Sequence, residues 1–99
     1  MIPMGDQVIL VVYDIRDDPL RLKVANFLKK LGFLRIQKSV FVAQFHPALL
    51  SETEAGIRRI VRDKDKFDVQ IYVFSQSSFD NRIVLSKGYY IEEEEEFLA

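Results

Sequence analysis

The chain has 99 residues, of which 48% are hydrophobic and 29% are charged, so it is long enough for one domain with its own packed core. It has no cysteine, which excludes a disulfide framework and a thiolate metal site and fits a reducing cytoplasm. The net charge is -1, but residues 92–96 hold five of the 15 acids; the other 10 stand against 14 Lys and Arg, which leaves the body near +4. A mildly basic body with an acidic tail is compatible with a polyanionic partner, and scattered solvated cations would give the same sum.

The segment 8–14 predicts a central β-strand that ends in an acid. Five apolar β-formers follow one another from Val8 to Val12, and then come Tyr13 and Asp14. An unbroken apolar run is typical of a strand buried on both faces, because alternation needs one wet face. The run is too short for a signal peptide or a membrane span, and no basic stretch precedes it.

A helix is predicted next, from Asp18 to Leu31. Asp18 can cap its start, and Pro19 fits the first helical position, where no N–H is needed. Apolar residues recur at helical spacing from Leu20 onward, and Gly32 is expected to end the helix in a left-handed conformation. The cations of this segment are left off the apolar stripe.

The remaining elements alternate between extended and helical patterns. Residues 33–45 indicate two strands, or one bent strand, around a polar patch at 37–39, and His46-Pro47 breaks that run. Ser51 and Glu54 have capping-box spacing and predict the start of a second helix. Residues 68–74 alternate as a strand does, and Arg82 to Leu85 predict a short further strand.

This order of elements predicts an α+β fold of the ferredoxin-like split βαβ type (βαββαβ) plus a short C-terminal strand. Right-handed crossovers would put both helices on one face of an antiparallel sheet. The other face carries apolar residues and needs a cover, for which a second copy of the same sheet, in a face-to-face homodimer, is the simplest candidate. We expect one domain over residues 1–88 and an acidic C-terminal tail over 89–99.

Asp14 is the first candidate for chemistry. A carboxylate at the end of a central strand can coordinate a hard cation such as Mg²⁺, although one carboxylate alone makes a poor magnesium site. From the pattern alone, an acid at this position more often helps the following loop to turn. Cations that could bind phosphates lie nearby in the expected fold: Arg16, Arg21, Lys23, Arg35 and Lys38.

Three other residues have two readings each. Tyr13 and Phe41 could stack on unpaired bases, but core packing or a dimer contact is the commoner role, and Ser39 is equally ambiguous. His46 is the one histidine and lies in an expected turn, without a second histidine for a zinc site. No phosphate-loop, dinucleotide-binding or nucleophile-elbow motif is present.

Two segments resemble a known family. Val11-Val12-Tyr13-Asp14-Ile15 followed by Asp17-Asp18 and Leu20-Arg21, and then Leu31-Gly32-Phe33-Leu34-Arg35-Ile36-Gln37-Lys38-Ser39-Val40-Phe41, are similar to the CRISPR-associated Cas-two family. These are small ferredoxin-like proteins of spacer acquisition, and the resemblance covers residues 8 to about 75.

The resemblance implies a face-to-face dimer in which the last strand of each chain adds to its partner's sheet. It implies that Asp14 is a Mg²⁺ ligand that faces its copy across the dimer. By motif position it assigns functional roles to Tyr13, Arg21, Arg35, Ser39 and Phe41, which join Asp14 as the candidate catalytic set. Lys23 stands where some members have arginine, so the charge is kept and the bidentate geometry is lost.

Two functions follow from the resemblance. One is a scaffold of CRISPR adaptation that holds double-stranded spacer-precursor DNA together with the Cas integrase. The other is a Mg²⁺-dependent endonuclease that hydrolyses phosphodiesters of RNA, in single strands, or of DNA. A toxin-like endoribonuclease on the same fold, with no role in integration, is the alternative. For the tail we hypothesise docking on the integrase through Phe97-Leu98, against the simpler reading of a solubilising extension.

Overall fold

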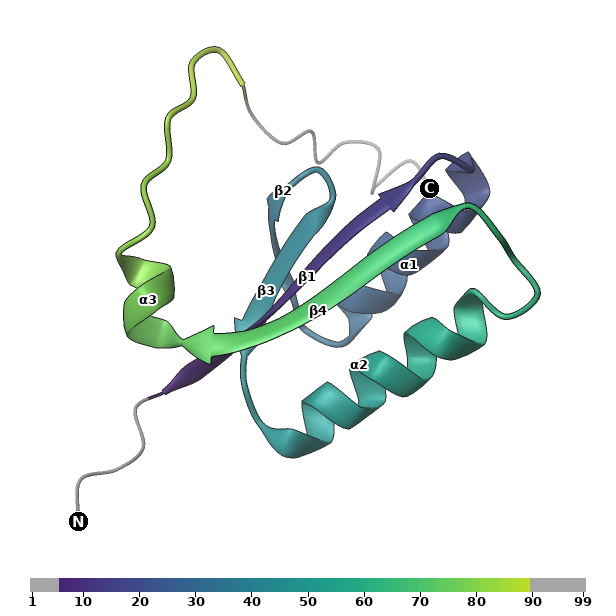
Figure 1. Cartoon of the computed structure of the whole chain (residues 1–99), viewed down its shortest axis with the longest axis horizontal. Helices are drawn as coiled ribbons and strands as arrows, with labels where there is room; N and C mark the ends of the chain where they lie inside the picture. The colour runs from purple at the N-terminus through teal and green to yellow at the C-terminus, as the bar shows by residue number, and fades with distance from the viewer. Residues whose placement is uncertain (1–5, 90–99) are drawn as a thin grey trace.

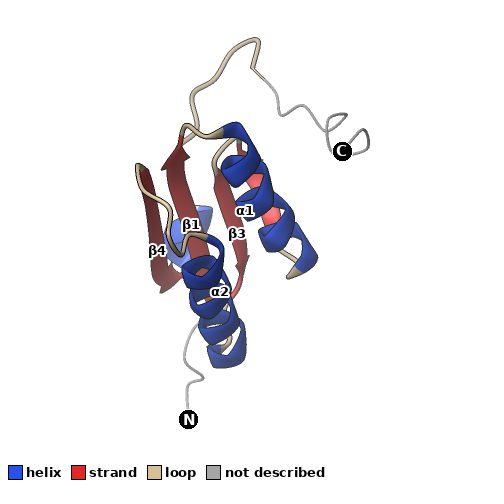
Figure 2. Cartoon of the chain, turned by 90° about the vertical axis from the view of Figure 1, so that its right-hand side faces the viewer, coloured by secondary structure: helices blue, strands red, loops and turns tan. Residues whose placement is uncertain are grey.

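The fold is a single antiparallel sheet covered on one face by two helices. The computed structural model describes residues 6–89 and contains, in chain order, β1 (Gln7–Ile15), α1 (Asp18–Lys30), β2 (Leu34–Gln37), β3 (Val40–Gln44), α2 (Pro47–Ile60), β4 (Phe67–Ser75) and α3 (Gln76–Asp80). The strand order is β2-β3-β1-β4, and every neighbouring pair is antiparallel. Helices α1 and α2 lie on the same face of the sheet (Figures 1 and 2). The predicted α+β split βαβ arrangement is therefore confirmed.

Strand β1 is the centre of the core, as its unbroken apolar run predicts. Its residues Ile9, Val11, Tyr13 and Ile15 are buried on the helix side, because alternate residues of a strand share one face. They pack with apolar residues of α1, α2 and the neighbouring strands: Leu20, Val24, Leu28, Phe33, Phe41, Leu49 and Ile57. The core thus fixes which face of β1 carries Asp14, since Asp14 lies between two core residues and belongs to the other face.

The face away from α1 and α2 carries an apolar row across all four strands. The registers place Leu34 of β2 opposite Val42 of β3, Val42 opposite Leu10 of β1, and Leu10 opposite Tyr72 of β4. Leu34 is 67% exposed and Tyr72 is 46% exposed in the single chain. This row provides an apolar surface on the side of the sheet that the two long helices do not cover.

Both long helices begin at positions that differ from the sequence prediction. Asp17, not Asp18, caps α1, and its carboxylate accepts from the backbone N–H of Leu20. Helix α2 begins at Pro47, so the predicted capping box at Ser51 is wrong. Pro47 needs no N–H partner at the first helical position and can start the helix a full turn earlier, with His46 as the preceding extended residue. Gly32 has the predicted left-handed backbone, with φ of 99°.

Helices α1 and α2 touch at one close contact. A Cβ atom placed on Gly56 of α2 would lie 2.0 Å from Cζ of Phe27 of α1. No side chain fits between that ring and the α2 backbone, so glycine is what allows the two helices to approach here. Between α2 and β4 an apolar groove of about 670 Å³ remains, lined by residues that include Ile57, Val61, Phe67, Val69 and Ile71.

The predicted strand at Arg82 to Leu85 is not formed within the single chain. Residues 82–86 have no regular secondary structure and run away from the sheet after α3 (Figure 1). Ile83, Val84 and Leu85 are 85%, 66% and 91% exposed. A strand needs a neighbour for its backbone hydrogen bonds, and the chain itself supplies none here.

Two further predictions concern the ends and the environment of the chain. Residues 90–99, which hold most of the predicted acidic tail, lie outside the described residues. Tyr89 is described, and its hydroxyl donates to Oε1 of Gln37 at the β2–β3 hairpin, at 3.0 Å. No helix among residues 6–89 has the length and apolar character that crossing a membrane requires.

Candidate functional site

Asp14 lies near the end of β1 on the face opposite to the helices. Its side chain is exposed, and its register partner on β4 is Asp68, so two carboxylates occupy one position on the same face of the sheet. Asp68 accepts a hydrogen bond from Nε2 of Gln70 at 3.0 Å. Beside Asp14 the surface forms a hollow of about 340 Å³ that Asp14 shares with Arg16 and Lys66. The hollow therefore joins an acid of β1 to two cations.

Tyr13 is next to Asp14 in sequence and on the opposite face in space. It is 3% exposed, and its hydroxyl has no hydrogen-bond partner among residues 6–89. Burial raises the pKa of Tyr13, and the nearby guanidinium groups of Arg35 and Arg21 oppose that rise only in part. Tyr13 is therefore a neutral core residue at ordinary pH, and the structure does not bring its ring into the hollow at Asp14.

Arg35, Phe41 and Ser39 form a second group with Tyr13. The Arg35 guanidinium lies 5.3 Å from the centre of the Phe41 ring, and the Phe41 and Tyr13 rings stack with centres 6.2 Å apart. Arg35 donates to the carbonyl of Lys38 from Nε at 3.1 Å and from Nη2 at 2.7 Å. The Tyr13 N–H donates to the Ser39 carbonyl at 3.1 Å. These contacts brace the β2–β3 hairpin against the end of β1.

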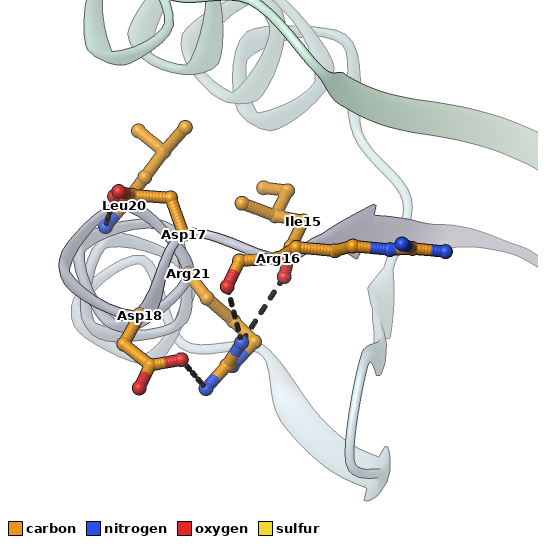
Figure 3. Close-up of polar contacts among 6 residues, drawn as sticks. All are labelled: Ile15, Arg16, Asp17, Asp18, Leu20 and Arg21. Atoms are coloured by element: carbon orange, nitrogen blue, oxygen red, sulfur yellow. Dashed lines mark hydrogen bonds and ion pairs between the residues drawn. The ribbon is translucent and has the colours of Figure 1, made fainter.

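Arg21 holds the loop between β1 and α1. Its Nη1 donates to the carbonyls of Ile15 at 3.1 Å and Arg16 at 3.4 Å, and its Nη2 pairs with Asp18 at 2.5 Å. Figure 3 shows the Arg21 side chain turned back to these carbonyls, whereas the Arg16 side chain extends away from them. Arg21 thus fixes the backbone from which Arg16 projects. Lys23 and Lys38, two more of the predicted nucleic-acid-binding residues, are exposed.

Comparison with known proteins decides the family. A sequence profile described as CRISPR associated protein Cas2 matches residues 7–82. The chain belongs to the Cas2 family. It is 39% identical over 75 residues to the CRISPR-associated endoribonuclease Cas2 2 of Pyrobaculum aerophilum, a match that covers 76% of this chain and 81% of that protein.

Two further comparisons extend the relation of this chain to Cas2 proteins. It is 35% identical over 75 residues to a Cas1/endonuclease Cas2 fusion of Thermoproteus tenax, and the match covers 76% of this chain and 28% of the fusion. A crystal structure of Cas2 superposes with a TM-score of 0.68 at 31% identity, covering 89% of this chain and 97% of that one. The resemblance noted in the sequence is therefore confirmed, and so is the fold.

The donor set at Asp14 fits the divalent metal that the resemblance to Cas2 proteins implies. Asp14 and Asp68 offer carboxylate oxygens, the ligand type that Mg²⁺ prefers. Within residues 6–89 no group of three or more His, Cys, Asp or Glu side chains is placed to hold a metal ion. A metal at Asp14 would need further oxygen ligands from water, from a substrate phosphate or from a second copy of the chain.

Sequence reasoning missed two residues of this Cas2 site, Asp68 and Lys66. Asp68 comes to Asp14 only through the β1–β4 register, which aligns residues 54 positions apart. Lys66 comes from the turn before β4 and lines the hollow. The alternation of residues 68–74 marked the strand, but the pairing partner of each residue is a tertiary property that a local pattern does not carry.

Proposed function

We propose that this chain is a homodimeric nucleic-acid-binding protein of CRISPR adaptation, with a Mg²⁺-dependent endonuclease site at Asp14. The observation that carries the proposal is the hollow in which the carboxylate of Asp14 meets the cations of Arg16 and Lys66. Acids that suit a metal and cations that suit phosphates are the two parts that phosphodiester hydrolysis needs. The relative from Pyrobaculum aerophilum is named an endoribonuclease, which supports RNA as a substrate.

The residues of the chain have separable tasks in this proposal. Asp14, with Asp68 beside it, would hold Mg²⁺, which when bound supplies charge neutralisation and an activated water at a phosphodiester. Arg16 attracts the phosphate backbone to the hollow, and Arg21 keeps the β1–α1 loop in the shape that presents Arg16. Tyr13, Arg35, Ser39 and Phe41 act through the position of the strand and hairpin ends.

The role in adaptation rests on the partner that a relative carries. A fusion of Cas1 with an endonuclease Cas2 in Thermoproteus tenax supports a Cas1-type integrase as the partner of this chain. We propose that the dimer holds double-stranded DNA for that integrase, in the cytoplasm, and that the acidic residues 92–96 with Phe97-Leu98 contact the integrase. Truncation after Gly88 should then weaken integrase binding in a pull-down of the purified proteins; unchanged binding removes the tail from the proposal.

The homodimer is proposed from two apolar surfaces of the single chain. The row through Leu34, Leu10 and Tyr72 would pack face to face with its copy. The exposed residues Ile83 and Leu85 would add to the outer edge of the partner's β4, where the apolar groove beside α2 can receive their side chains. Together these contacts would bury the largest apolar exposures of the chain.

The cleavage proposal is tested with Asp14→Asn. Purified wild type should cleave single-stranded RNA or DNA with Mg²⁺ and lose that activity in EDTA, and Asp14→Asn should lose it at unchanged thermal stability. Glu52→Gln, which removes an exposed acid of α2 far along the chain, is the matched control and should stay active. Cleavage by Asp14→Asn equal to wild type would refute the nuclease assignment.

The scaffold proposal is tested in the same variants by spacer integration. Asp14→Asn should leave integration by the integrase complex intact, because no chemistry of this chain is needed for it. Arg16→Gln should weaken duplex binding and lower integration, because it removes an exposed cation of the hollow. Full integration with Arg16→Gln would argue that duplex DNA is held elsewhere.

A further inference from the structure

We propose that Lys66, in the turn between α2 and β4, binds a backbone phosphate of the nucleic acid beside Asp14. The inference rests on the proposed function and names a contact of the same site. It assigns the phosphodiester backbone, and not a base, as the group that Lys66 recognises.

The backbone at Lys66 has an uncommon conformation. Its φ is 58°, in the left-handed region that residues other than glycine, asparagine and aspartate rarely adopt, and Asp63 of the same turn has φ of 65°. A lysine in this conformation costs about 1 kcal/mol or more relative to an unstrained one. The turn itself is held by the Lys64 N–H, which donates to the Val61 carbonyl at 2.9 Å. Asparagine or glycine would suit the backbone better, so the lysine side chain requires an explanation beyond the turn.

The turn places Lys66 directly beside the end of β1. Phe67, the next residue, is the register partner of Ile15, so Lys66 precedes β4 at the level where β1 ends and Arg16 follows. Lys66 and Arg16 line the hollow together with Asp14. Two cations from two different elements therefore meet at the carboxylate that is the candidate metal ligand.

The charge of Lys66 is available to a ligand, unlike that of two other candidate cations. Arg21 is engaged with the carbonyls of the β1–α1 loop, and Arg35 with the carbonyl of Lys38. Within residues 6–89 the side chains of Lys66 and Arg16 form no ion pair and no hydrogen bond. An ammonium group is a compact point charge that binds phosphate oxygens without a fixed orientation. Lys66 and Arg16 can thus hold one phosphate between them next to Asp14.

The acids around the hollow decide what Lys66 can bind. Asp14 and Asp68 lie on the neighbouring strand ends, and Asp63 and Asp65 lie in the turn. An anionic ligand alone is repelled by these carboxylates. A phosphate that arrives together with a divalent cation is not, because the cation neutralises the carboxylates and leaves the two basic side chains for the phosphate. Lys66 should therefore contribute more to binding in Mg²⁺ than in EDTA.

The experiment measures binding of a fluorescent single-stranded RNA oligonucleotide to the full chain against salt concentration, in Ca²⁺ or Mg²⁺ under conditions without turnover. Lys66→Gln should lower the affinity about three- to tenfold at low salt and reduce the slope of log K against log salt by about 0.7. Lys66→Arg should restore both values. Lys64→Gln, with the same charge change two residues away, is the matched control and should keep the wild-type slope.

A folding defect is separated from a lost contact by Lys66→Asn. Asparagine accepts the left-handed backbone, so this variant should be at least as stable as wild type and still show the reduced slope. A wild-type slope in Lys66→Gln, or an equal loss in Lys64→Gln, overturns the inference and leaves the proposed function standing. Absence of any binding by wild type overturns the proposed function and this inference together.

Discussion

Asp14 of β1 and Asp68 of β4 are direct register partners on the face of the sheet away from α1 and α2. Like charges directly opposite each other on neighbouring strands destabilise the sheet unless something neutralises them. A protein that gains nothing from this pair would be expected to hold a neutral or oppositely charged residue at one of the two positions. The pair therefore agrees with a site at which a cation is bound.

The repulsion predicts a stability gain on neutralising either acid in the absence of metal. Asp14→Asn and Asp68→Asn should each raise the free energy of unfolding in EDTA by up to about 1 kcal/mol, and the gain should shrink at high salt. Urea unfolding of the two variants measures this. Mg²⁺ should raise the thermal midpoint of wild type and should have no such effect on Asp14→Asn. A stability loss in both variants in EDTA would contradict the repulsion.

Tyr13→Phe should leave the stability at neutral pH unchanged or raise it. The hydroxyl is buried without a hydrogen-bond partner among the described residues, so removing it abolishes an uncompensated desolvation of about 1–3 kcal/mol. Thermal unfolding at pH 7 checks this. A loss of 2 kcal/mol or more would mean that the hydroxyl has a partner in the assembled protein.

Tyr13 also predicts the alkaline limit of stability. Burial raises its pKa in the folded chain above the ordinary value of 10.0, so the folded state keeps the proton when the unfolded state has lost it. Stability is then fully present below pH 10 and falls as the pH rises from about 10 toward the raised folded pKa. Unfolding midpoints measured from pH 8 to 11 should fall less steeply in Tyr13→Phe than in wild type; identical slopes would contradict the assignment.

Arg21 should be required for stability more than its charge suggests. It makes two hydrogen bonds to loop carbonyls and one ion pair with Asp18, and its side chain is only 31% exposed. Arg21→Ala should lower the free energy of unfolding by about 1–2 kcal/mol, and Arg21→Lys should restore little because it cannot form the forked contact. Lys23→Ala, an exposed cation of the same helix, should cost less than about 0.5 kcal/mol in the same urea titration.

The segment 82–85 predicts that stability depends on protein concentration. If Ile83 and Leu85 are buried only in a dimer, then dilution should lower the thermal midpoint of wild type. Ile83→Lys should shift the protein toward the monomer in sedimentation experiments. Ser77→Lys, at an exposed position of α3, adds the same charge nearby and should leave the dimer intact. A monomeric wild type at all concentrations would refute the proposed strand addition.

Local patterns were sufficient for the elements that carry their own signals. The apolar run of β1, the helical stripe that starts at Leu20 and the stop at Gly32 each correspond to an observed element. The start of α2 was predicted too late because the capping-box spacing of Ser51 and Glu54 outweighed Pro47 in the pattern, although proline at a first helical position is also a start signal. The fifth strand depends on a neighbour that the single chain lacks.

The site was less accessible from the sequence than the fold. Asp14 and Arg16 were named because they follow a strand, and the structure places both at the hollow. Lys66 and Asp68 were not named, because only the register of β4 with β1 brings them there. Arg21 and Arg35 were named as phosphate binders from their charge, whereas their contacts with backbone carbonyls depend on loop and hairpin geometry that a sequence does not display.

The contact of Gly56 with the Phe27 ring has a consequence for genetic screens of this protein. Any substitution at Gly56 must push the two helices apart, since even a Cβ atom would lie 2.0 Å from the ring. A screen for loss of CRISPR immunity would therefore recover Gly56 alleles beside Asp14 alleles, far from any nucleic acid. A smaller residue at position 27 could act as a second-site suppressor of a Gly56→Ala allele, and no such suppressor should exist for Asp14→Asn.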